Sequence, residues 1–208
     1  MSDAVGDAYT EVAELYASLF LNDLAGDQFA QLWLAKFAAC AATQGGVVAD
    51  LGCGPGHVVH YLTDLGVQAM GYDISPGQLA QARDAFPDLS FELGDLQDLA
   101  VADSSLGGIC SRYSIIHLEL AAHGSAFAEW HRVLAPDAPL LLSFFGAESA
   151  STHGESFDHT VATAYALHPA TVAEGLEAVG FVDVEVATQP PPDGGRPYDQ
   201  AVMLARRA

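Results

Sequence analysis

The feature that most constrains the fold is an apolar run, Val47 to Leu51, that leads into a loop with alternating glycines. Four to eight apolar residues bounded by turn formers are typical of a strand buried on both faces. Glycines in the loop adopt positive φ and leave backbone N–H groups open to a ligand. The segment therefore predicts a buried strand that ends at a backbone loop for a nucleotide-like ligand.

The spacing of the glycines and the acid before them narrow the choice of ligand. A dinucleotide fingerprint has the pattern Gly-x-Gly-x-x-Gly facing a pyrophosphate, whereas this chain has Gly-x-Gly-x-Gly at Gly52, Gly54 and Gly56. Asp50, two residues before the first glycine, would repel a pyrophosphate and attract an ammonium group. The pattern favours a zwitterionic, positively charged cofactor.

Several landmarks together resemble one protein family. The segment Asp50 to Gly56 resembles motif I of the class I S-adenosylmethionine-dependent methyltransferases. Later segments resemble this family in its own order: Gly71 to Ser75, Gly94 to Leu96, Gly107 to Leu118 and Val133 to Ala138. A lone glycine motif is weak evidence, and it is the joint occurrence that makes the resemblance specific.

The resemblance implies S-adenosyl-L-methionine as the cofactor and S-adenosyl-L-homocysteine as its product. Asp50 and the glycine loop would hold the methionine part, Asp73 the ribose hydroxyls, and Asp95 the adenine amino group. A turn cap, a helix N-terminal acid and an exposed turn acid are the structural alternatives for these three aspartates. The other candidate cofactor contacts are Tyr9, Gly52, Cys53, Gly54, Gly56, Ile74, Leu96, Arg112 and Tyr113.

His117, in the loop after the fourth predicted strand, is the candidate general base. An unperturbed histidine pKa of about 6.5 suits proton removal near neutral pH, although a hydrogen-bonded structural histidine is the competing interpretation. Arg112 in the same loop would pair with an acid of the cofactor site, with a substrate carboxylate, or in a surface salt bridge. We expect Tyr9 to contact the methionine carboxylate and Tyr16 to pack in the core. Candidates for substrate contact, with surface or core packing as alternatives, are His153, His159, Tyr165 and His168.

Hydrophobic periodicity predicts strands that alternate with helices. The expected helices cover 7–20, 27–42, 56–65, 75–86, 122–134 and 169–179, and the expected strands cover 47–51, 67–72, 89–93, 106–111, 139–145, 181–187 and 198–205. Such alternation implies right-handed βαβ units and ligands at the carboxyl ends of the strands. With the resemblance, we expect an α/β fold: a doubly wound, Rossmann-like sheet of seven strands, mostly parallel with an antiparallel last strand, helices on both faces and an N-terminal helical extension.

The length of 208 residues suits one domain, and the chain contains no linker-like segment. We expect a helical cap at 1–44, a cofactor-binding core at 45–146, an insert over the site at 147–168, and a C-terminal helix with a strand hairpin at 169–208. Because 147–157 has glycine, serine, threonine and acids but no apolar period, it is predicted to be a loop.

An acidic composition limits the partners. With 27 acids and 7 bases the net charge is −20, which disfavours nucleic acids and anionic membrane surfaces. The excess acid maintains solubility in the simpler interpretation, and a cationic substrate is the alternative. Without a secretory start or an apolar stretch of membrane-spanning length, we expect a cytoplasmic protein. The three cysteines are expected to be reduced, and no histidine or cysteine spacing indicates a metal site.

The leading hypothesis is a methyltransferase that uses S-adenosylmethionine to methylate an oxygen, nitrogen or carbon atom of an unidentified small molecule, as a monomer or homodimer. A non-catalytic S-adenosylmethionine-binding protein is the first alternative. A nicotinamide-dependent oxidoreductase is the second, and the Gly-x-Gly-x-Gly spacing argues against it.

Overall fold

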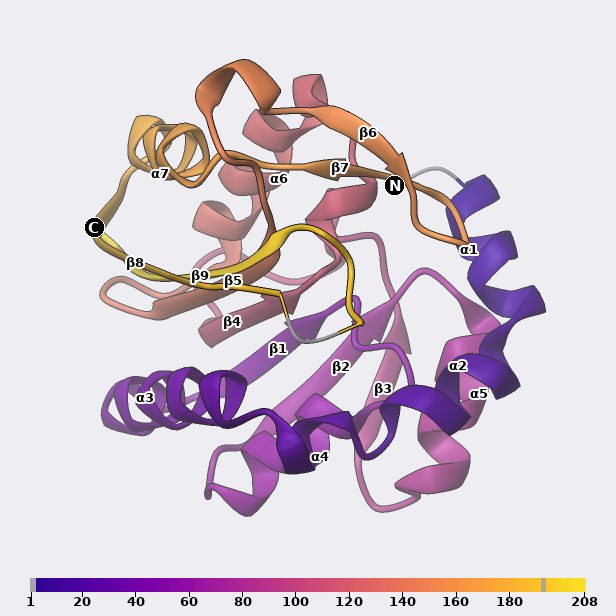
Figure 1. The fold of residues 1–208 in the computed structure, drawn as a ribbon. Helices are drawn as coiled ribbons and strands as arrows, with labels where there is room; N and C mark the ends of the chain where they lie inside the picture. Colours follow the sequence, from indigo (N-terminus) through magenta and orange to yellow (C-terminus); the bar gives the residue numbers. More distant parts are fainter. Residues whose placement is uncertain (1–2, 192–193) are drawn as a thin grey trace.

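A seven-stranded sheet forms the centre of the computed structural model, which describes residues 3–191 and 194–208 (Figure 1). Its strand order is β3-β2-β1-β4-β5-β9-β8. The strands are β1 (Val47–Leu51), β2 (Ala69–Asp73), β3 (Ser90–Leu93), β4 (Leu106–Arg112), β5 (Pro139–Gly146), β8 (Phe181–Gln189) and β9 (Asp199–Arg207). Strand β9 pairs antiparallel with β5 and β8, and the other pairs are parallel. The predicted doubly wound sheet is confirmed, and strand order reverses beside β1, where such sheets bind ligands.

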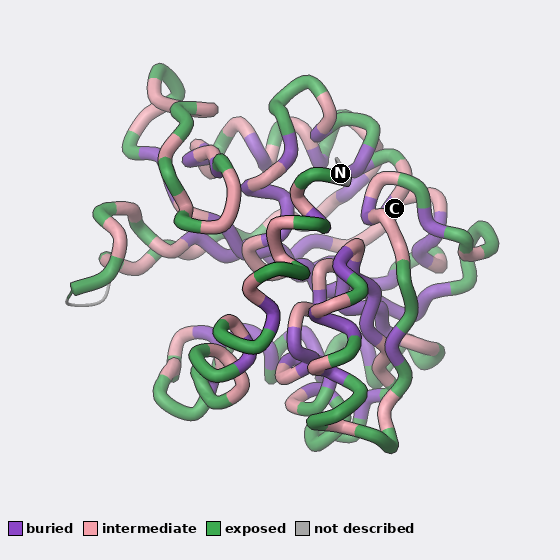
Figure 2. The backbone as a smooth tube through the Cα atoms, turned by 90° about the vertical axis from the view of Figure 1, so that its right-hand side faces the viewer, coloured by how far each residue is buried: buried purple, intermediate pink, exposed green. Residues whose placement is uncertain are grey.

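Helices cover both faces of the sheet, as predicted (Figure 1). The larger helices are α3 (Gln28–Gln44), α4 (His57–Asp64), α5 (Pro76–Ala85), α6 (Leu120–Val133) and α7 (Pro169–Ala178). Helices α3, α4 and α5 pack on one face, and α6 and α7 pack on the other. Figure 2 shows that the most buried backbone lies in the strands between these layers. The layers hold the carboxyl ends of β1, β2 and β4 in fixed positions.

The N-terminal extension is helical, but it divides where a single helix over 7–20 is predicted. Helix α1 (Asp3–Glu11) ends before Val12, whose φ of −108° and ψ of 12° are not helical, and α2 (Ala13–Phe20) follows. A short 3₁₀ turn, η1 (Asp23–Gly26), connects α2 to α3. Because of this break, α1 and α2 bend around the carboxyl end of the sheet beside α5 (Figure 1).

The segment after β5 contains more regular structure than predicted. Instead of a continuous loop over 147–157, it has a 3₁₀ turn, η3 (Ala150–Thr152), and a strand, β6 (Glu155–Asp158). Strand β6 pairs antiparallel with β7 (Thr163–Ala166). Three of the four β6 residues are exposed, so this strand carries no apolar period that the sequence could show.

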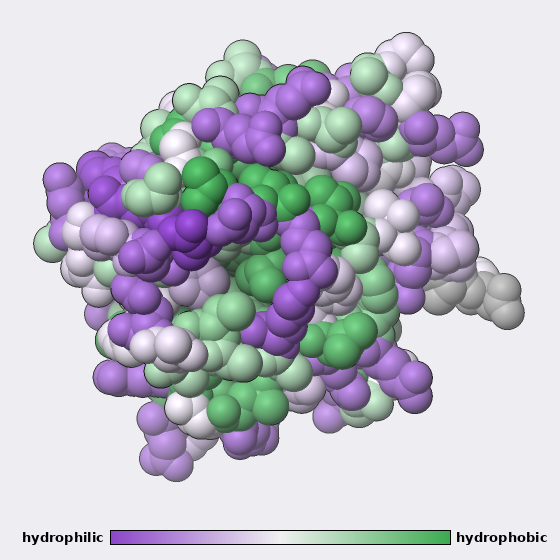
Figure 3. Space-filling model, turned by 90° about the vertical axis from the view of Figure 1, so that its left-hand side faces the viewer, coloured by the Kyte–Doolittle hydropathy of each residue, from purple (hydrophilic) through white to green (hydrophobic). Residues whose placement is uncertain are grey.

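The edge strand β8 lies beside α3, and Lys36 of α3 pairs with Glu185 of β8. Figure 3 views this side of the molecule, where apolar surface alternates with hydrophilic side chains. None of the helices in the described residues has the length and apolar character needed to cross a bilayer. Cys53 and Cys110 are buried, Cys40 is exposed, and all three are free thiols.

Candidate functional site

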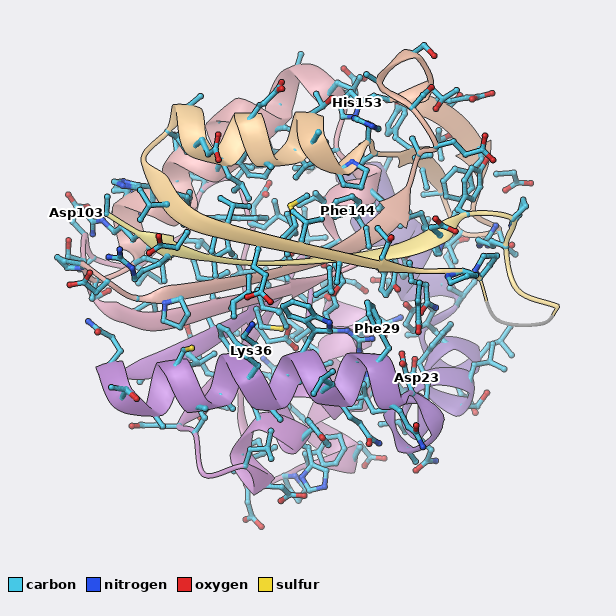
Figure 4. The ribbon with its side chains drawn as sticks, turned by 60° about the vertical axis from the view of Figure 1, so that its left-hand side comes forward. Asp23, Phe29, Lys36, Asp103, Phe144 and His153 are labelled. Atoms are coloured by element: carbon cyan, nitrogen blue, oxygen red, sulfur yellow. The ribbon has the colours of Figure 1, made fainter. Side chains whose placement is uncertain are left out.

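A cavity of about 520 Å³ opens at the carboxyl end of the sheet, within the range of roughly 300 to 1,000 Å³ that is typical of small-molecule sites. Helices α1 and α2 form one side, and the loop after β1 and the end of β4 form the base. The end of β5, the turn at 159–161 and the loop at 195–198 form the other side. In Figure 4, Asp23 lies at this end of the molecule and Asp103 at the opposite end. The cavity is therefore where a doubly wound sheet binds its ligand.

The glycine loop has the open backbone that its spacing predicts. Gly52 has a φ of +75°, and a Cβ there would lie 2.1 Å from the Ser114 Oγ atom. Gly56 has a φ of +86°, and its Cβ would lie 2.7 Å from the Phe91 ring. Any larger side chain at either position would be both strained and in collision. The loop thus requires glycine for its own conformation as well as for access by a ligand.

Asp50 is the strongest sign of a missing partner in this cavity. It is 1% exposed, and its Oδ2 atom has no hydrogen-bond partner among the described residues. Burial raises its pKa to about 7, Arg112 opposes that rise and Asp73 adds to it. A buried carboxylate without a partner is costly unless a cation compensates it. The site therefore fits the ammonium group of a zwitterionic ligand.

Arg112 ends β4 at the base of the cavity. Its Nη2 atom lies 3.7 Å from the Asp27 Oδ2 atom, its side chain is 9% exposed, and its guanidinium lies 5.7 Å from the Tyr113 ring centre. The Nε atom has no partner in residues 3–191 and 194–208. The surface salt bridge is therefore the wrong interpretation, because the pair is largely shielded from solvent. Asp27 also caps α3 by accepting a hydrogen bond from the Ala30 N–H, which links the arginine to the start of that helix.

Asp73 lies at the end of β2, as predicted, but beneath the N-terminal extension. Its Oδ1 atom accepts a hydrogen bond of 2.8 Å from the Ser75 N–H, and its Oδ2 atom accepts one of 2.8 Å from the Gly54 N–H. Burial raises its pKa, and these hydrogen bonds oppose the rise. The carboxylate thus connects the glycine loop to the segment before α5 through these two hydrogen bonds.

Helix α1 covers this part of the site. A Cβ on Gly6 would lie 3.1 Å from the Ile74 carbonyl oxygen, and the Thr10 and Ser75 hydroxyls are 2.8 Å apart. The Gln78 side-chain amide donates to the Tyr9 carbonyl at 3.3 Å. As a result, Asp73 is only 8% exposed and does not line the cavity.

The structure brings seven of the predicted site residues to the cavity: Tyr9, Asp50, Gly52, Cys53, Gly54, Arg112 and Tyr113. The others do not line it: Gly56, Asp73, Ile74, Asp95, Leu96 and His117. Asp95 lies in the turn after β3, where its Oδ1 atom accepts from the Gln97 N–H at 2.9 Å, and Leu96 beside it is buried. The roles of all these residues toward the cofactor stay predictions.

Tyr9 and His117 form a pair across 108 positions of the chain. The Tyr9 hydroxyl lies 2.8 Å from His117 Nε2, and His117 Nδ1 lies 2.9 Å from the Thr163 carbonyl oxygen. A carbonyl only accepts, so Nδ1 carries the proton and Nε2 accepts from Tyr9. Burial lowers the pKa of His117 and raises that of Tyr9, so both are neutral near pH 7.

This pair separates two hollows. Tyr9 lines the 520 Å³ cavity, and His117 lines a neighbouring one of about 600 Å³ that is bounded by α1 and the turn at 161–163. Because both ring nitrogens of His117 are hydrogen-bonded, its geometry agrees with the structural interpretation. Its role as a base stays a prediction, and its Nε2 atom is hydrogen-bonded to the Tyr9 hydroxyl.

Tyr16 faces the cavity instead of the core, so that prediction is wrong. Its ring lies 5.4 Å from that of Tyr9 and 4.2 Å from that of Phe20, and burial raises its pKa to about 12. The apolar face of α2 covers the cavity, and Leu15 and Leu19 at its rim are 63% and 62% exposed. A helical apolar face alone could not show whether it covers a core or a ligand.

Of the four candidates for substrate contact, His159 lines the cavity and Tyr165 lines the neighbouring hollow. His153 and His168 line neither of them. Instead, the His168 backbone N–H donates to the His153 Nδ1 atom at 2.9 Å.

Sequence reasoning missed three residues that face His159 and its surroundings: Phe145, Arg196 and Tyr198. Phe145 near the end of β5 could have been found by the rule that ligands meet strand ends. Arg196 carries no signal, because its loop has no apolar period, and Tyr198 is predicted only as the first residue of the last strand.

Comparisons with known proteins agree with this geometry. Residues 48–137 match the model of a methyltransferase domain family. The demethylmenaquinone methyltransferase of Beutenbergia cavernae is 30% identical over 142 residues, covering 68% of this chain and 58% of that protein. The chain spans only 55 to 58% of the length of this and two other curated relatives.

Solved structures share the fold over nearly the whole chain. One is a 1,6-didemethyltoxoflavin-N1-methyltransferase from Burkholderia thailandensis with bound S-adenosylhomocysteine, with a TM-score of 0.75, 20% identity and coverage of 99% of this chain and 88% of that one. Another is the [4+2]-cyclase SpnF, with a TM-score of 0.76, 19% identity and coverage of 100% and 97%. At these identities the neighbours show the fold, and their different reactions show that the fold alone does not decide the chemistry.

Proposed function

This chain belongs to the class I S-adenosylmethionine-dependent methyltransferases, and from that premise we propose that it transfers a methyl group to an oxygen, nitrogen or carbon atom of a small molecule. The observation that carries the proposal is Asp50, a buried carboxylate beside an open glycine loop, whose Oδ2 atom has no hydrogen-bond partner in the described part of the chain. The loop and the acid open onto one cavity, which also reaches side chains from β5 and the loop at 195–198. Cofactor and acceptor would therefore meet in one space.

The residues present fit the cofactor in two places. Asp50 would hold its ammonium group, with the backbone at Gly52 and Gly54 around the rest of the amino-acid part. Asp73 would accept the ribose hydroxyls, since a carboxylate has about four lone-pair positions, of which the backbone N–H groups of Gly54, Ser75 and Ile74 occupy only a part. Because α1 covers Asp73 and Ile74, that helix must shift to admit a ribose.

When bound, the cofactor supplies an activated methyl group on a positively charged sulfur. The protein has to align the acceptor atom with that methyl group and keep water out, a proximity effect that contributes several kcal/mol. Tyr113 at the base, Phe145 at the end of β5 and Tyr16 on α2 supply the apolar walls for this alignment. For an acceptor that loses a proton, the neutral Nε2 of His117 would take the Tyr9 proton while the Tyr9 oxygen takes that of the acceptor.

Calorimetric titration with S-adenosylmethionine and S-adenosylhomocysteine tests the proposal. We expect both to bind, and we expect nicotinamide adenine dinucleotide not to displace them because the glycine spacing and Asp50 disfavour a pyrophosphate. Absence of binding at millimolar concentration would contradict the proposal. Once cofactor binding is established, a screen of candidate acceptors with methyl-labelled cofactor identifies the acceptor.

A further inference from the structure

Aromatic rings dominate the cavity beyond the glycine loop. Six phenylalanine and tyrosine rings line it together with two histidines: Tyr9, Tyr16, Phe20, Tyr113, Phe145, Tyr198, His57 and His159. They come from α1, α2, α4, β5, the segment after β4, the turn at 159–161 and the loop at 195–198. Segments distant in sequence thus contribute flat side chains to one space.

The rings form two walls. On the helical side, the Tyr9 and Tyr16 ring centres are 5.4 Å apart and those of Tyr16 and Phe20 are 4.2 Å apart. On the strand side, Phe145 lies 4.9 Å from Tyr113 and 6.3 Å from Tyr198. In the part of the chain that the structure describes, Tyr16 and Phe20 have no ring contact with the strand-side wall. Tyr9 is connected to that wall at one end through His117, whose ring centre lies 5.4 Å from that of Tyr9 and 5.1 Å from that of His159. Ring spacings of about 4.5 to 7 Å favour offset or edge-to-face packing, which a flat ligand between two such walls would extend.

Polar groups beside the strand-side wall determine which functional group a bound flat ligand would carry. The Arg196 guanidinium donates to the carbonyls of Asp158 at 2.8 Å and His159 at 2.9 Å, which fixes the turn that presents His159. The Nδ1 atom of His159 is buried and has no partner among the residues described. Burial lowers the pKa of His159 to about 4, and nearby His117 and Arg196 add to that effect, so the imidazole is neutral and available for a hydrogen bond.

A cationic acceptor fits this side less well, although aromatic faces attract cations. The carboxylates in the cavity lie elsewhere: Asp27 is paired with Arg112, Asp23 lies 3.5 Å from the His57 ring, and Asp50 faces the glycine loop. Two charged groups act on His159. The Arg196 guanidinium lines the cavity and repels an ammonium group, whereas the Asp158 carboxylate does not line it.

We propose that the methyl acceptor is a flat aromatic or conjugated molecule with a hydroxyl group, held between the two walls with that hydroxyl toward His159. This inference rests on the proposed function, and it names the chemical class of the second substrate. The hydroxyl is a recognition group, and the methylated atom is a separate question.

The test titrates the full chain, saturated with S-adenosylhomocysteine, with phenol, 2-naphthol and 7-hydroxycoumarin. Cyclohexanol and decahydro-2-naphthol serve as saturated counterparts, and cyclohexylamine as the cation. At least one flat probe should bind about ten-fold more tightly than the saturated probes and the amine. Equal affinities, or a preference for cyclohexylamine, would overturn the inference.

Two variants locate the effect. Phe145→Leu keeps apolar volume and removes the flat ring, so the preference for flat probes should fall by about five-fold. Phe157→Leu is the matched control, because Phe157 lies 5.6 Å from Phe145 but does not line the cavity. His159→Phe keeps a ring and removes Nδ1, so the preference for 2-naphthol over naphthalene should fall by about five-fold. Equal losses in the two leucine variants, or an unchanged preference in His159→Phe, would overturn the placement.

The two proposals fail separately. Retained binding of S-adenosylhomocysteine without any preference for flat probes overturns the acceptor class alone. If S-adenosylhomocysteine does not bind, the proposed function falls, and the same probes titrated into the free chain still decide whether the cavity selects flat hydroxylated molecules.

Discussion

Two halves of the cavity are held in place by different means. The strand-end half is formed by the glycine loop and the ends of β1, β4 and β5, and the cap half by α1, α2, the turn at 159–161 and the loop at 195–198. At the strand ends, the Gly52 and Cys53 N–H groups donate to the Tyr72 carbonyl, which ties the glycine loop to β2. In the cap, Tyr9 contacts His117 across 108 positions, and Arg196 contacts the Asp158 carbonyl across 38. Backbone pairing between neighbouring strands fixes the first half, whereas side-chain contacts between distant segments fix the second.

The two halves also differ in exposure. Asp50 at the strand end is 1% exposed, while Leu15 and Leu19 on the cap are more than half exposed. A half built on buried strands suits a constant ligand, and a half built on helices and loops suits a variable one. This difference leads us to place the cofactor at the strand ends and the acceptor under the cap.

The largest expected effect on binding and stability follows from Gly52→Ala, which disrupts the strand-end half. The positive φ costs about 1 to 2 kcal/mol, and the collision with Ser114 adds about 1 to 3 kcal/mol. We expect loss of S-adenosylhomocysteine binding and a drop of about 3 kcal/mol in the free energy of unfolding, measured by urea denaturation.

Gly66→Ala is the matched control for this change. Gly66 has a φ of +84°, but a Cβ there meets no atom of the described residues within 4 Å. Only the strain of about 1 to 2 kcal/mol therefore applies, and binding should persist. Equal losses in both variants would mean that the close packing at Gly52 is unimportant.

A smaller loss of binding is expected from Asp73→Ala. The Gly54 and Ser75 N–H groups would lose their acceptor, and ribose hydroxyls would lose theirs, a loss on the order of 1 to 3 kcal/mol in binding. Asp73→Asn keeps one acceptor oxygen and should retain part of the affinity. Calorimetry with S-adenosylhomocysteine measures both, and unchanged affinity in Asp73→Ala would remove this residue from the site.

The pH dependence of binding sharpens the role of Asp50. Its pKa is raised from 3.8 to about 7, so the carboxylate gains its charge as pH rises through about 7, and the affinity for the ammonium of S-adenosylhomocysteine should rise with it. In the protein without ligand, raising the pH has the opposite effect on the Asp50 contribution to folding stability. The unfolded chain loses the proton near 3.8 while the fold keeps it to about 7, so the Asp50 contribution to stability falls as pH rises between these values.

Asp50→Asn separates these effects. Titrations between pH 5.5 and 8.5 should show weaker binding with a flatter pH profile, and urea denaturation at pH 8 should show a more stable free protein. A variant that keeps the wild-type pH profile for binding would assign that profile to another group.

The smallest effect is expected in the cap, from Tyr9→Phe. One hydrogen bond to His117 is lost, worth about 0.5 to 1.5 kcal/mol, so S-adenosylhomocysteine binding should change by less than about ten-fold. Methyl transfer to an acceptor that loses a proton should fall further than binding. Tyr16→Phe is the control, because Tyr16 shares the cavity without a hydrogen bond to His117. Equal loss of turnover in both variants would contradict a role for the Tyr9–His117 pair.

The sequence predicted the strand-end half because its signals are local. Apolar runs, glycines with positive φ and acids at strand ends all act within a few residues, so the sheet, the loop and the position of Asp50 were found. Asp73 was placed correctly on β2, but its cover by α1 depends on contacts of Gly6 and Thr10 with residues more than sixty positions away.

The cap half was predicted only in outline, as an N-terminal helical extension, because its contacts join segments that are distant in the sequence. Strand β6 exposes most of its side chains, and it is held by pairing with β7 and by the single partly buried ring of Phe157. Tyr16 lies on an apolar helix face whose partner is a cavity. Even at the strand ends, the pairing of Arg112 with Asp27 joins the end of β4 to the start of α3, a contact that no local pattern encodes.

A structure of the chain with S-adenosylhomocysteine bound would test most directly whether the two halves divide the substrates. We predict the amino-acid end of the ligand beside Asp50 and Gly52, with its sulfur open to the space lined by Tyr113 and Phe145. A ligand whose sulfur is sealed from that space would contradict methyl transfer and would identify a cofactor-binding protein without an acceptor.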